Sequence, residues 1–261
     1  MSTTAQKIKV FGAVGIPSKA NQFPLQPDHL VKIGQAIGII LTRQAPPHTT
    51  PKVVIGKDTR LSGYMLEIAL ISGLLSTGLL VLLVSHLPKP GVGFITSNMR
   101  AALGIVISAS HNPFYDNGIT IIGPDGYKIS DAMEAEIEHM VSADDFEASL
   151  ARHENVRRSR RIEDAQGRYI VYVKNSLSPR LHSRWSTHRP RHRQRRSYKI
   201  APAIFSEPGA EVILIGNAPN EVNINDACGA LSPDVISEAL LKYRADAEIS
   251  LGGNTEGRHH R

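Results

Sequence analysis

The chain has 261 residues, 41% hydrophobic and 21% charged, so it can bury a sizeable core and is not a disordered chain. Its single cysteine, Cys228, excludes an internal disulfide and a cysteine zinc cluster, and the N-terminus lacks a signal-peptide pattern, so we expect a cytoplasmic protein. The formal charge of +6 is local, because residues 176–199 contribute seven arginines and one lysine without an acid, which leaves −2 elsewhere.

Strand-like and helix-like runs alternate through the first part of the chain. Hydrophobic periodicity and end signals predict a strand at 8–11, a helix at 28–44 opened by Pro27, a strand at 53–55, a helix near 91–103, strands at 104–107 and 119–122, and a helix from Ser130 toward Met140. The alternation predicts an α/β fold, a mixed sheet with helices on both faces. In the last helix, Glu134, Glu136 and Glu138 are expected on a solvated face.

The stretch 68–87 carries no formal charge and has about the length of a membrane span. Glycine and hydroxyl residues interrupt it, and Gly78 lies where a helix would end before a β-rich run. We interpret the stretch as a helix, a turn and a buried strand at 79–84, and expect no membrane partner. A membrane-spanning helix is the alternative.

Residues 151–161 are basic and polar, which is typical of a linker. Beyond them the sequence predicts a helix at 164–174 and then a second α/β unit. The recognisable parts of this unit are residues 203–205, a strand at 212–215, a helix at 233–243 with Ser232 at its N-cap, and a strand at 249–251. We therefore expect two domains, at 1–155 and 156–261. The second is an incomplete α/β domain with an aberrant arginine-rich insert at 176–197.

The sharpest local motif is Ser-Ala-Ser-His-Asn-Pro at 108–113, directly after an apolar strand. A serine at the carboxyl end of a strand, with polar neighbours and a closing proline, is well placed to meet a ligand above the sheet. A plain turn is the alternative, because all these residues are common in loops.

This motif, followed by Asp-Asn-Gly-Ile at 116–119, resembles the phosphoserine loop of the phosphohexomutases. Further motifs resemble the phosphoglucosamine mutase branch of that family, and they lie at 56–67, 88–94, 124–129, 164–170, 200–220 and 224–230. The resemblance implies an isomerase that moves a phosphoryl group between O6 and O1 of a phosphorylated hexosamine. It places the phosphoryl group on Ser110, the second serine of the motif.

The resemblance also implies the neighbours of that serine. Phosphoryl transfer needs cationic groups that neutralise charge, and Lys57 and Arg60 are the cations expected nearest the loop. The alternative is that both are surface charges paired with Asp58 and Glu67. His111 is a further candidate catalytic residue, or a hydrogen-bonding scaffold for the loop.

Three departures from the family pattern concern phosphate and metal binding. Pro17 stands where the family has an arginine, and Thr120 stands where it has a lysine, for which Lys128 is too distant to substitute. The aspartate-rich magnesium loop of the family aligns with 252–257. Together with Ser110, its remaining candidate ligands are Asn254 and Glu256, a set expected to hold Mg²⁺ only weakly.

The segment 180–197 is rich in Arg, His, Pro and Ser where the family has a buried strand, and we interpret it as the product of compensating frameshifts. A basic arm for nucleic acid, with Trp185 and Tyr198 as stacking groups, is the less favoured alternative. The family's two further domains would not fit after Arg261. We therefore expect a mutase-like chain of low activity, with an inactive remnant or a polyanion-binding module as the alternatives.

Overall fold

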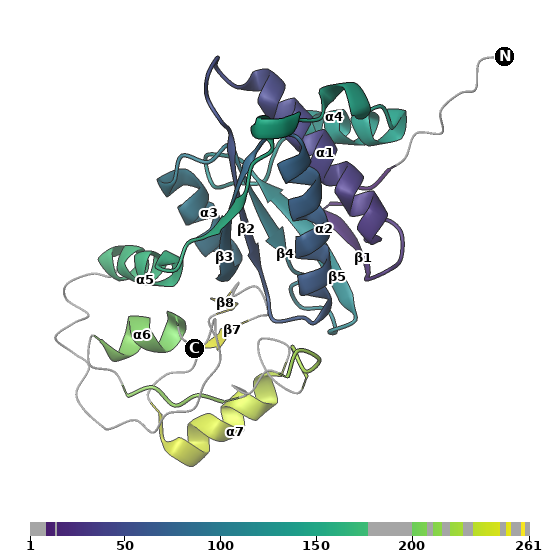
Figure 1. The fold of residues 1–261 in the computed structure, drawn as a ribbon. Helices are drawn as coiled ribbons and strands as arrows, with labels where there is room; N and C mark the ends of the chain where they lie inside the picture. The colour runs from purple at the N-terminus through teal and green to yellow at the C-terminus, as the bar shows by residue number, and fades with distance from the viewer. Residues whose placement is uncertain are drawn as a thin grey trace.

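The computed structural model of the protein is shown in Figure 1. It describes residues 9–13, 15–176, 200–207, 211–215, 220–226, 232–245, 249–251 and 257–258. The arginine-rich segment 180–197, Cys228, Asn254 and Glu256 therefore lie outside the described residues.

A six-stranded sheet with the order β1-β5-β4-β2-β3-β6 forms the centre of the fold. Its strands are β1 (Ile16–Lys19), β2 (Lys52–Lys57), β3 (Leu80–His86), β4 (Leu103–Ile107), β5 (Asp116–Ile122) and β6 (Ser159–Arg161). The strands β4, β2, β3 and β6 are parallel, whereas β5 is antiparallel to both β4 and β1. This confirms the predicted mixed sheet.

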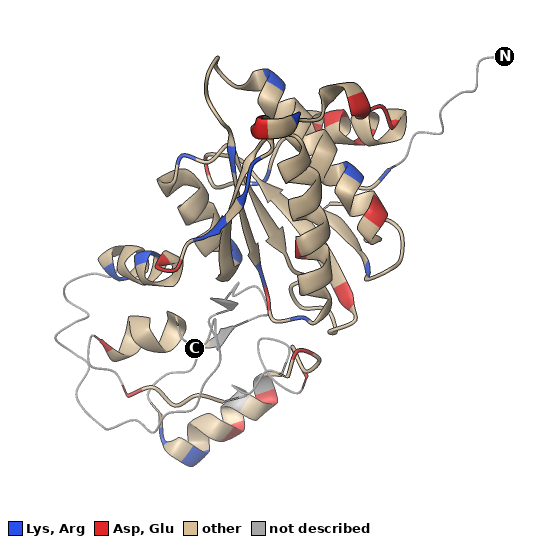
Figure 2. Cartoon of the chain, in the orientation of Figure 1, with Lys and Arg blue, Asp and Glu red and all other residues tan. Residues whose placement is uncertain are grey.

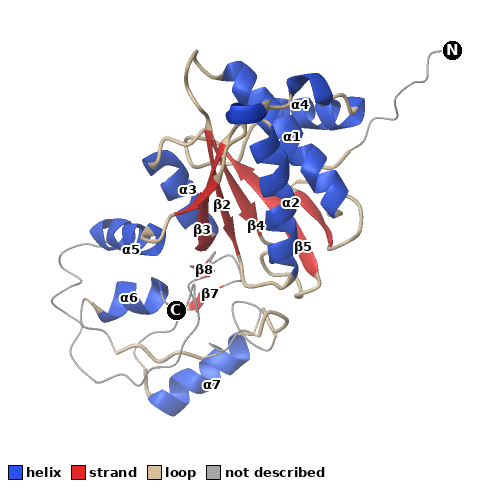
Figure 3. Cartoon of the chain, viewed as in Figure 1, coloured by secondary structure: helices blue, strands red, loops and turns tan. Residues whose placement is uncertain are grey.

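Helices cover both faces of this sheet, as predicted (Figure 3). The helices are α1 (Pro27–Gln44), α2 (Ser62–Ser76), α3 (Lys89–Asn98), α4 (Asp131–Ala143), α5 (Ala165–Ser176), α6 (Ile200–Ser206) and α7 (Pro233–Tyr243), with short 3₁₀ turns at Glu147–Ser149 and His153–Asn155. Buried residues of α1, α2 and α4 form one hydrophobic cluster, and those of α3, α5 and α6 form the other. Because side chains alternate along a strand, Val53 and Ile55 of β2 enter the first cluster and Val54 the second.

Close contact between α1 and α2 depends on two glycines. A Cβ atom added to Gly73 would collide with the carbonyl oxygen of Val31, and one added to Gly34 would lie 2.8 Å from the carbonyl oxygen of Leu70. A residue with a side chain at either position would therefore force the two helix backbones apart. This contact lies at the middle of the first cluster and sets the separation of the two helices.

The uncharged stretch 68–87 folds as predicted. It comprises most of α2, a turn at Gly78 with a φ of 86°, and β3. Within the described ranges, no helix combines the length and the apolar character that a bilayer crossing requires.

The predicted strand at 8–11 is wrong for the described residues 9–11, which form no strand. The reason is a buried carboxylate. Glu138 Oε1 accepts hydrogen bonds from the backbone amides of Val10 and Phe11, at 2.8 and 2.9 Å, so these amides do not need a neighbouring strand. The first strand is instead β1, which pairs with β5.

The same contacts correct the expectation for α4. Glu134 and Glu138 are 8% and 9% exposed, so two of the three carboxylates face the protein rather than solvent. Glu134 pairs with Lys128 at 3.0 Å, which compensates its charge. Burying a carboxylate is costly unless it is paired or hydrogen-bonded; Glu134 meets the first condition through Lys128, and Glu138 meets the second through the two amides.

Two further segments differ from the prediction. The expected linker 151–161 contains β6, which extends the sheet because Ser159–Arg161 pair with Val81–Leu83. Its basic residues suit an exposed edge strand. The expected strand at 212–215 has no strand pairing within the described part of the chain, and its isoleucines Ile213 and Ile215 are exposed.

Two elements at the end of the chain follow the prediction. The helix α7 has the predicted bounds 233–243, whereas residues 203–205, for which no element type was predicted, lie within α6. Ser232 occupies the N-cap position of α7 without a side-chain capping bond. The last predicted strand corresponds to β7 (Ser250–Leu251), which pairs with β8 (Gly257–Arg258).

Candidate active site at the carboxyl end of β4

The 108–113 loop leaves the carboxyl end of β4, in the middle of the sheet. Ser110 has a φ of 52°, in the left-handed region that is uncommon for residues other than glycine. Its Oγ lies 2.7 Å from Nδ1 of His111, and its amide donates to Oγ of Ser108 at 3.1 Å. The structure therefore brings Ser110 and His111 together within hydrogen-bond distance.

Short local bonds close this loop onto β5. The amide of Ser108 donates to the carbonyl of Gly118 at 2.8 Å, and the amide of Asn112 donates to the carbonyl of Ala109 at 3.1 Å. The Asn112 side chain also donates to Asp116 at 3.0 Å. These bonds explain why a polar sequence ending in proline forms a tight turn instead of extending β4.

Arg60 lies beside the loop, in the turn between β2 and α2, where charges of both signs follow one another (Figure 2). Its side chain is fully buried and forms an ion pair with Asp58. Its Nη2 donates to the carbonyl oxygens of Asn112, at 2.6 Å, and of Ser110, at 3.4 Å. The guanidinium therefore holds the backbone of the loop, and its charge is paired with Asp58.

Asp58 connects this ion pair to the loop. Burial raises the pKa of the Asp58 carboxyl above its usual value, whereas the charge of Arg60 and hydrogen bonds from Ser108 and Arg60 oppose the rise. The amide of Asp58 donates to the carbonyl of Ile107 at 3.1 Å, which ties the end of β2 to the end of β4. Buried Asp58 and half-buried Ser108 thus form a polar contact next to Ser110.

Lys57 does not share the position of Arg60. Its Nζ pairs with Glu67 on α2 and lies 4.0 Å from the ring centroid of Tyr64. Lys57 and Arg60 thus pair with the two carboxylates named in the alternative interpretation. Both cations are buried, however, so they are not surface charges.

One contact with the loop was not anticipated. Nδ2 of Asn225 donates to the carbonyl oxygens of Ser110 and Asn112, at 2.9 and 3.1 Å. Asn225 belongs to the 224–230 motif of the family resemblance, so the sequence marked the region, although nothing in it marked this residue.

The residues that depart from the family pattern are also placed. Pro17 lies in β1 opposite Gly118, where an edge strand tolerates a residue without an amide hydrogen. Thr120 is buried in β5 opposite Val106. Lys128 bridges to Ile122, so it lies at the end of β5 away from the loop.

Of the candidate magnesium ligands, the structure describes only Ser110. Asn254 and Glu256 fall outside the described residues, and the rest of the set, Ser110, already has His111 at its hydroxyl. One carboxylate, one amide and one hydroxyl supply few of the hard anionic oxygens that Mg²⁺ prefers. Over the described ranges, no group of three or more His, Cys, Asp or Glu side chains is placed to hold a metal.

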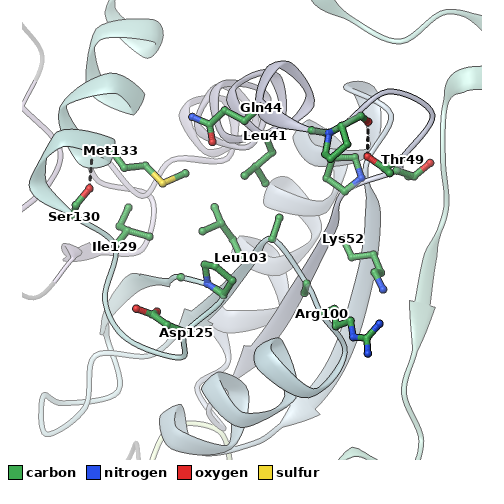
Figure 4. Close-up of a pocket in the computed structure, with 18 of the residues that line it drawn as sticks. Leu41, Gln44, Thr49, Lys52, Arg100, Leu103, Asp125, Ile129, Ser130 and Met133 are labelled. Carbon is green, nitrogen blue, oxygen red and sulfur yellow. Dashed lines mark hydrogen bonds between the residues drawn. The ribbon is translucent and has the colours of Figure 1, made fainter.

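A pocket of about 690 Å³ lies at the opposite end of the sheet (Figure 4). Leu41, Leu103, Ile129 and Met133 line its apolar part, and Lys52 and Arg100 lie at its edge. Lys52 and Leu103 are the first residues of β2 and β4, so the pocket is separated from Ser110 by the length of the strands.

Comparison with known proteins identifies the family of the chain. Residues 8–148 match the family model of the phosphoglucomutase/phosphomannomutase α/β/α domain I. The chain is 53% identical over 253 residues to a phosphoglucosamine mutase of Bdellovibrio bacteriovorus, which covers 96% of this chain and 55% of the relative. It is 44% identical over 248 residues to that of Pelobacter propionicus, which covers 95% of this chain and 54% of the relative.

A solved structure from Burkholderia thailandensis, a phosphoglucomutase/phosphomannomutase family protein, has the same fold. It aligns with a TM-score of 0.66 at 21% identity and covers 97% of this chain and 54% of its own. The chain spans about half the length of the curated relatives it matches. The chain belongs to the phosphoglucomutase/phosphomannomutase family, and its first 148 residues include domain I of that family.

Proposed function

We propose that this chain carries the phosphoryl-bearing part of a phosphoglucosamine mutase site, with Ser110 as the residue that accepts and returns the phosphoryl group. The observation that carries the proposal is the placement of Ser110, at the carboxyl end of β4, with its Oγ 2.7 Å from His111. The 53% identity to a phosphoglucosamine mutase supports glucosamine 6-phosphate as the substrate.

The reaction consists of two transfers. Phosphoserine 110 gives its phosphoryl group to O1 of glucosamine 6-phosphate, so the bond between phosphorus and Oγ breaks and a bond to O1 forms. The O1 proton moves to Oγ. The resulting bisphosphate then returns the O6 phosphoryl group to Oγ, whose proton passes to O6, and glucosamine 1-phosphate is released.

His111 and Arg60 have different roles in this scheme. In the tautomer that carries its proton on Nε2, His111 accepts the Ser110 hydroxyl at Nδ1 and holds that proton near Oγ. Arg60 is a positioning residue, because its charge is paired with Asp58 and its Nη2 holds two loop carbonyls. Lys57, paired with Glu67, stabilises the start of α2.

We propose that turnover by this chain is low. Pro17 and Thr120 replace a guanidinium and an ammonium that the family resemblance places near the phosphate. Asn254 and Glu256 provide a poor set of magnesium ligands. Charge on the transferring phosphoryl group is therefore compensated less than the reaction requires.

The test is phosphorylation of the purified chain by a hexose 1,6-bisphosphate, followed by intact mass, beside a coupled assay with glucosamine 6-phosphate and Mg²⁺. We expect one phosphate on the wild type, on the peptide that contains Ser110, and none on Ser110→Ala. Slow turnover should disappear in the same variant. A wild type that takes no phosphate, or a variant that keeps its activity, contradicts the proposal.

A further inference from the structure

The segment 220–226 contacts the Ser110 loop from a distant part of the chain. In Figure 1 it lies near the first turn of α2, which Leu61 precedes. The carbonyl of Glu221 accepts a hydrogen bond from the amide of Leu61 at 3.1 Å, and Asn225 donates to the loop carbonyls. The segment is therefore anchored both to the turn that carries Arg60 and to the loop that carries Ser110.

Asn225 and Arg60 converge on the same two acceptors. Each carbonyl oxygen has two lone pairs, so those of Ser110 and Asn112 can accept from both side chains at once. Arg60 reaches them at 3.4 and 2.6 Å, and Asn225 at 2.9 and 3.1 Å. The weaker bond of Arg60, to the Ser110 carbonyl, is thus complemented by the stronger bond of Asn225.

The backbone at this contact also needs support. Ser110, Glu221 and Asn225 have φ values of 52°, 72° and 61°, all in the left-handed region. Such conformations persist when surrounding contacts fix them, and they cluster where a side chain must be aimed. The bonds from Asn225 hold the carbonyls of Ser110 and Asn112, and so restrain the backbone from which the Ser110 side chain projects.

We propose that residues 220–226 form a clasp over the nucleophile loop, and that Asn225 is the positioning residue through which this clasp holds Ser110. The clasp rests on the geometry alone, whereas its effect on phosphoryl transfer rests on the proposed function. Ser110 is then held from two sides, by Arg60 next to β2 and by Asn225 in a segment 115 residues further along the chain.

The sharpest variant is Asn225→Asp in the full chain. Aspartate has the shape of asparagine and tolerates the left-handed region, but its carboxylate cannot donate to the two carbonyls. The matched control is Asn220→Asp, in the same segment, where the exposed side chain accepts from the amide of Val222 and can still do so. Asn225→Ala removes the donor without adding charge.

Hydrogen–deuterium exchange of the full-length variants measures the clasp directly. We expect exchange in peptides spanning 108–116 to be on the order of tenfold faster in Asn225→Asp and Asn225→Ala, with no change in Asn220→Asp. Peptides from β2 and β4 report whether each variant is folded. If Asn225→Asp does not fold, Asn225→Ala decides, and unchanged loop exchange in a folded Asn225 variant overturns the clasp.

Phosphorylation of Ser110 by a hexose 1,6-bisphosphate separates the clasp from the proposed reaction. We expect several-fold slower phosphorylation in Asn225→Asp and the wild-type rate in Asn220→Asp. If loop exchange is faster in the Asn225 variants but the wild type takes no phosphate, the clasp is retained and the proposed function is rejected. Normal phosphorylation with normal loop exchange in both Asn225 variants would reject the clasp and retain the function.

Discussion

Replacement of Arg60 by methionine tests the buried ion pair beneath the nucleophile loop. Methionine fills part of the same space but removes the charge that faces Asp58 and the donors that reach the loop. Because both side chains are buried, the substitution leaves a carboxylate without its partner in the interior. Breaking a buried pair in this way costs about 3–5 kcal/mol, and we expect a loss of that size near neutral pH.

The loss should depend on pH. The pKa of Asp58 is already raised from 3.8, so the folded state holds this proton more tightly than the unfolded state, and stability falls as pH rises through the folded pKa. Arg60 opposes the rise, so its removal raises the folded pKa further. The deficit of Arg60→Met relative to wild type should therefore be smaller at about pH 5 than at about pH 8.

Urea unfolding followed by far-UV circular dichroism measures the free energy of unfolding at both pH values. The double variant Asp58→Asn/Arg60→Met, which buries no charge at this point, should be more stable than Arg60→Met at the higher pH and should lose the added pH dependence. An Arg60→Met protein that loses less than about 1 kcal/mol, or loses the same amount at both pH values, would refute the reasoning.

Two further predictions concern the packing around the site. Glu138→Ala should lower the free energy of unfolding by about 1–3 kcal/mol, because two buried amides lose their acceptor. Glu138→Gln keeps an acceptor oxygen and should cost less. Thermal unfolding compares the two variants, and equal costs would contradict this account. Gly73→Ala should lower the free energy of unfolding, measured by urea titration, by about 1–3 kcal/mol, because the new methyl group meets the carbonyl of Val31. Gly167→Ala, with open space around its Cβ, should be neutral or stabilising. Similar effects of both substitutions would argue against close α1–α2 contact.

The sequence predicted elements well where local patterns determine them. The predicted helices at 28–44 and 233–243 match α1 and α7, because each has a clear helical period and a proline in its first turn. The turn at Gly78 was predictable because a left-handed residue after an apolar helix is a common end of that helix. The loop at 108–113 was singled out by its motif, and the family that the motifs indicated is shown by the match of residues 8–148 to its domain I.

The failures share a different cause, which is contact between distant parts of the chain. An amphipathic pattern cannot show that Glu138 binds amides 127 and 128 residues earlier, so an apolar segment was assigned to a strand and a buried carboxylate to the surface. The family resemblance predicted that Arg60 would lie near the loop, but not that it would bind carbonyls there. Asn225 was missed because its two acceptors lie more than a hundred residues away.

The long reach of the N-terminal contacts has a consequence for biosynthesis. Residues 10–19 leave the ribosome long before their partners, because the acceptor for Val10 and Phe11 is Glu138 and the strand that pairs with β1 begins only at Asp116. Non-local contacts of this kind form late and slowly, so the growing chain carries residues 10–19 unpaired through most of the synthesis of the domain. A nascent chain that stalls before residue 138 cannot form the hydrogen bonds from Val10 and Phe11 to Glu138.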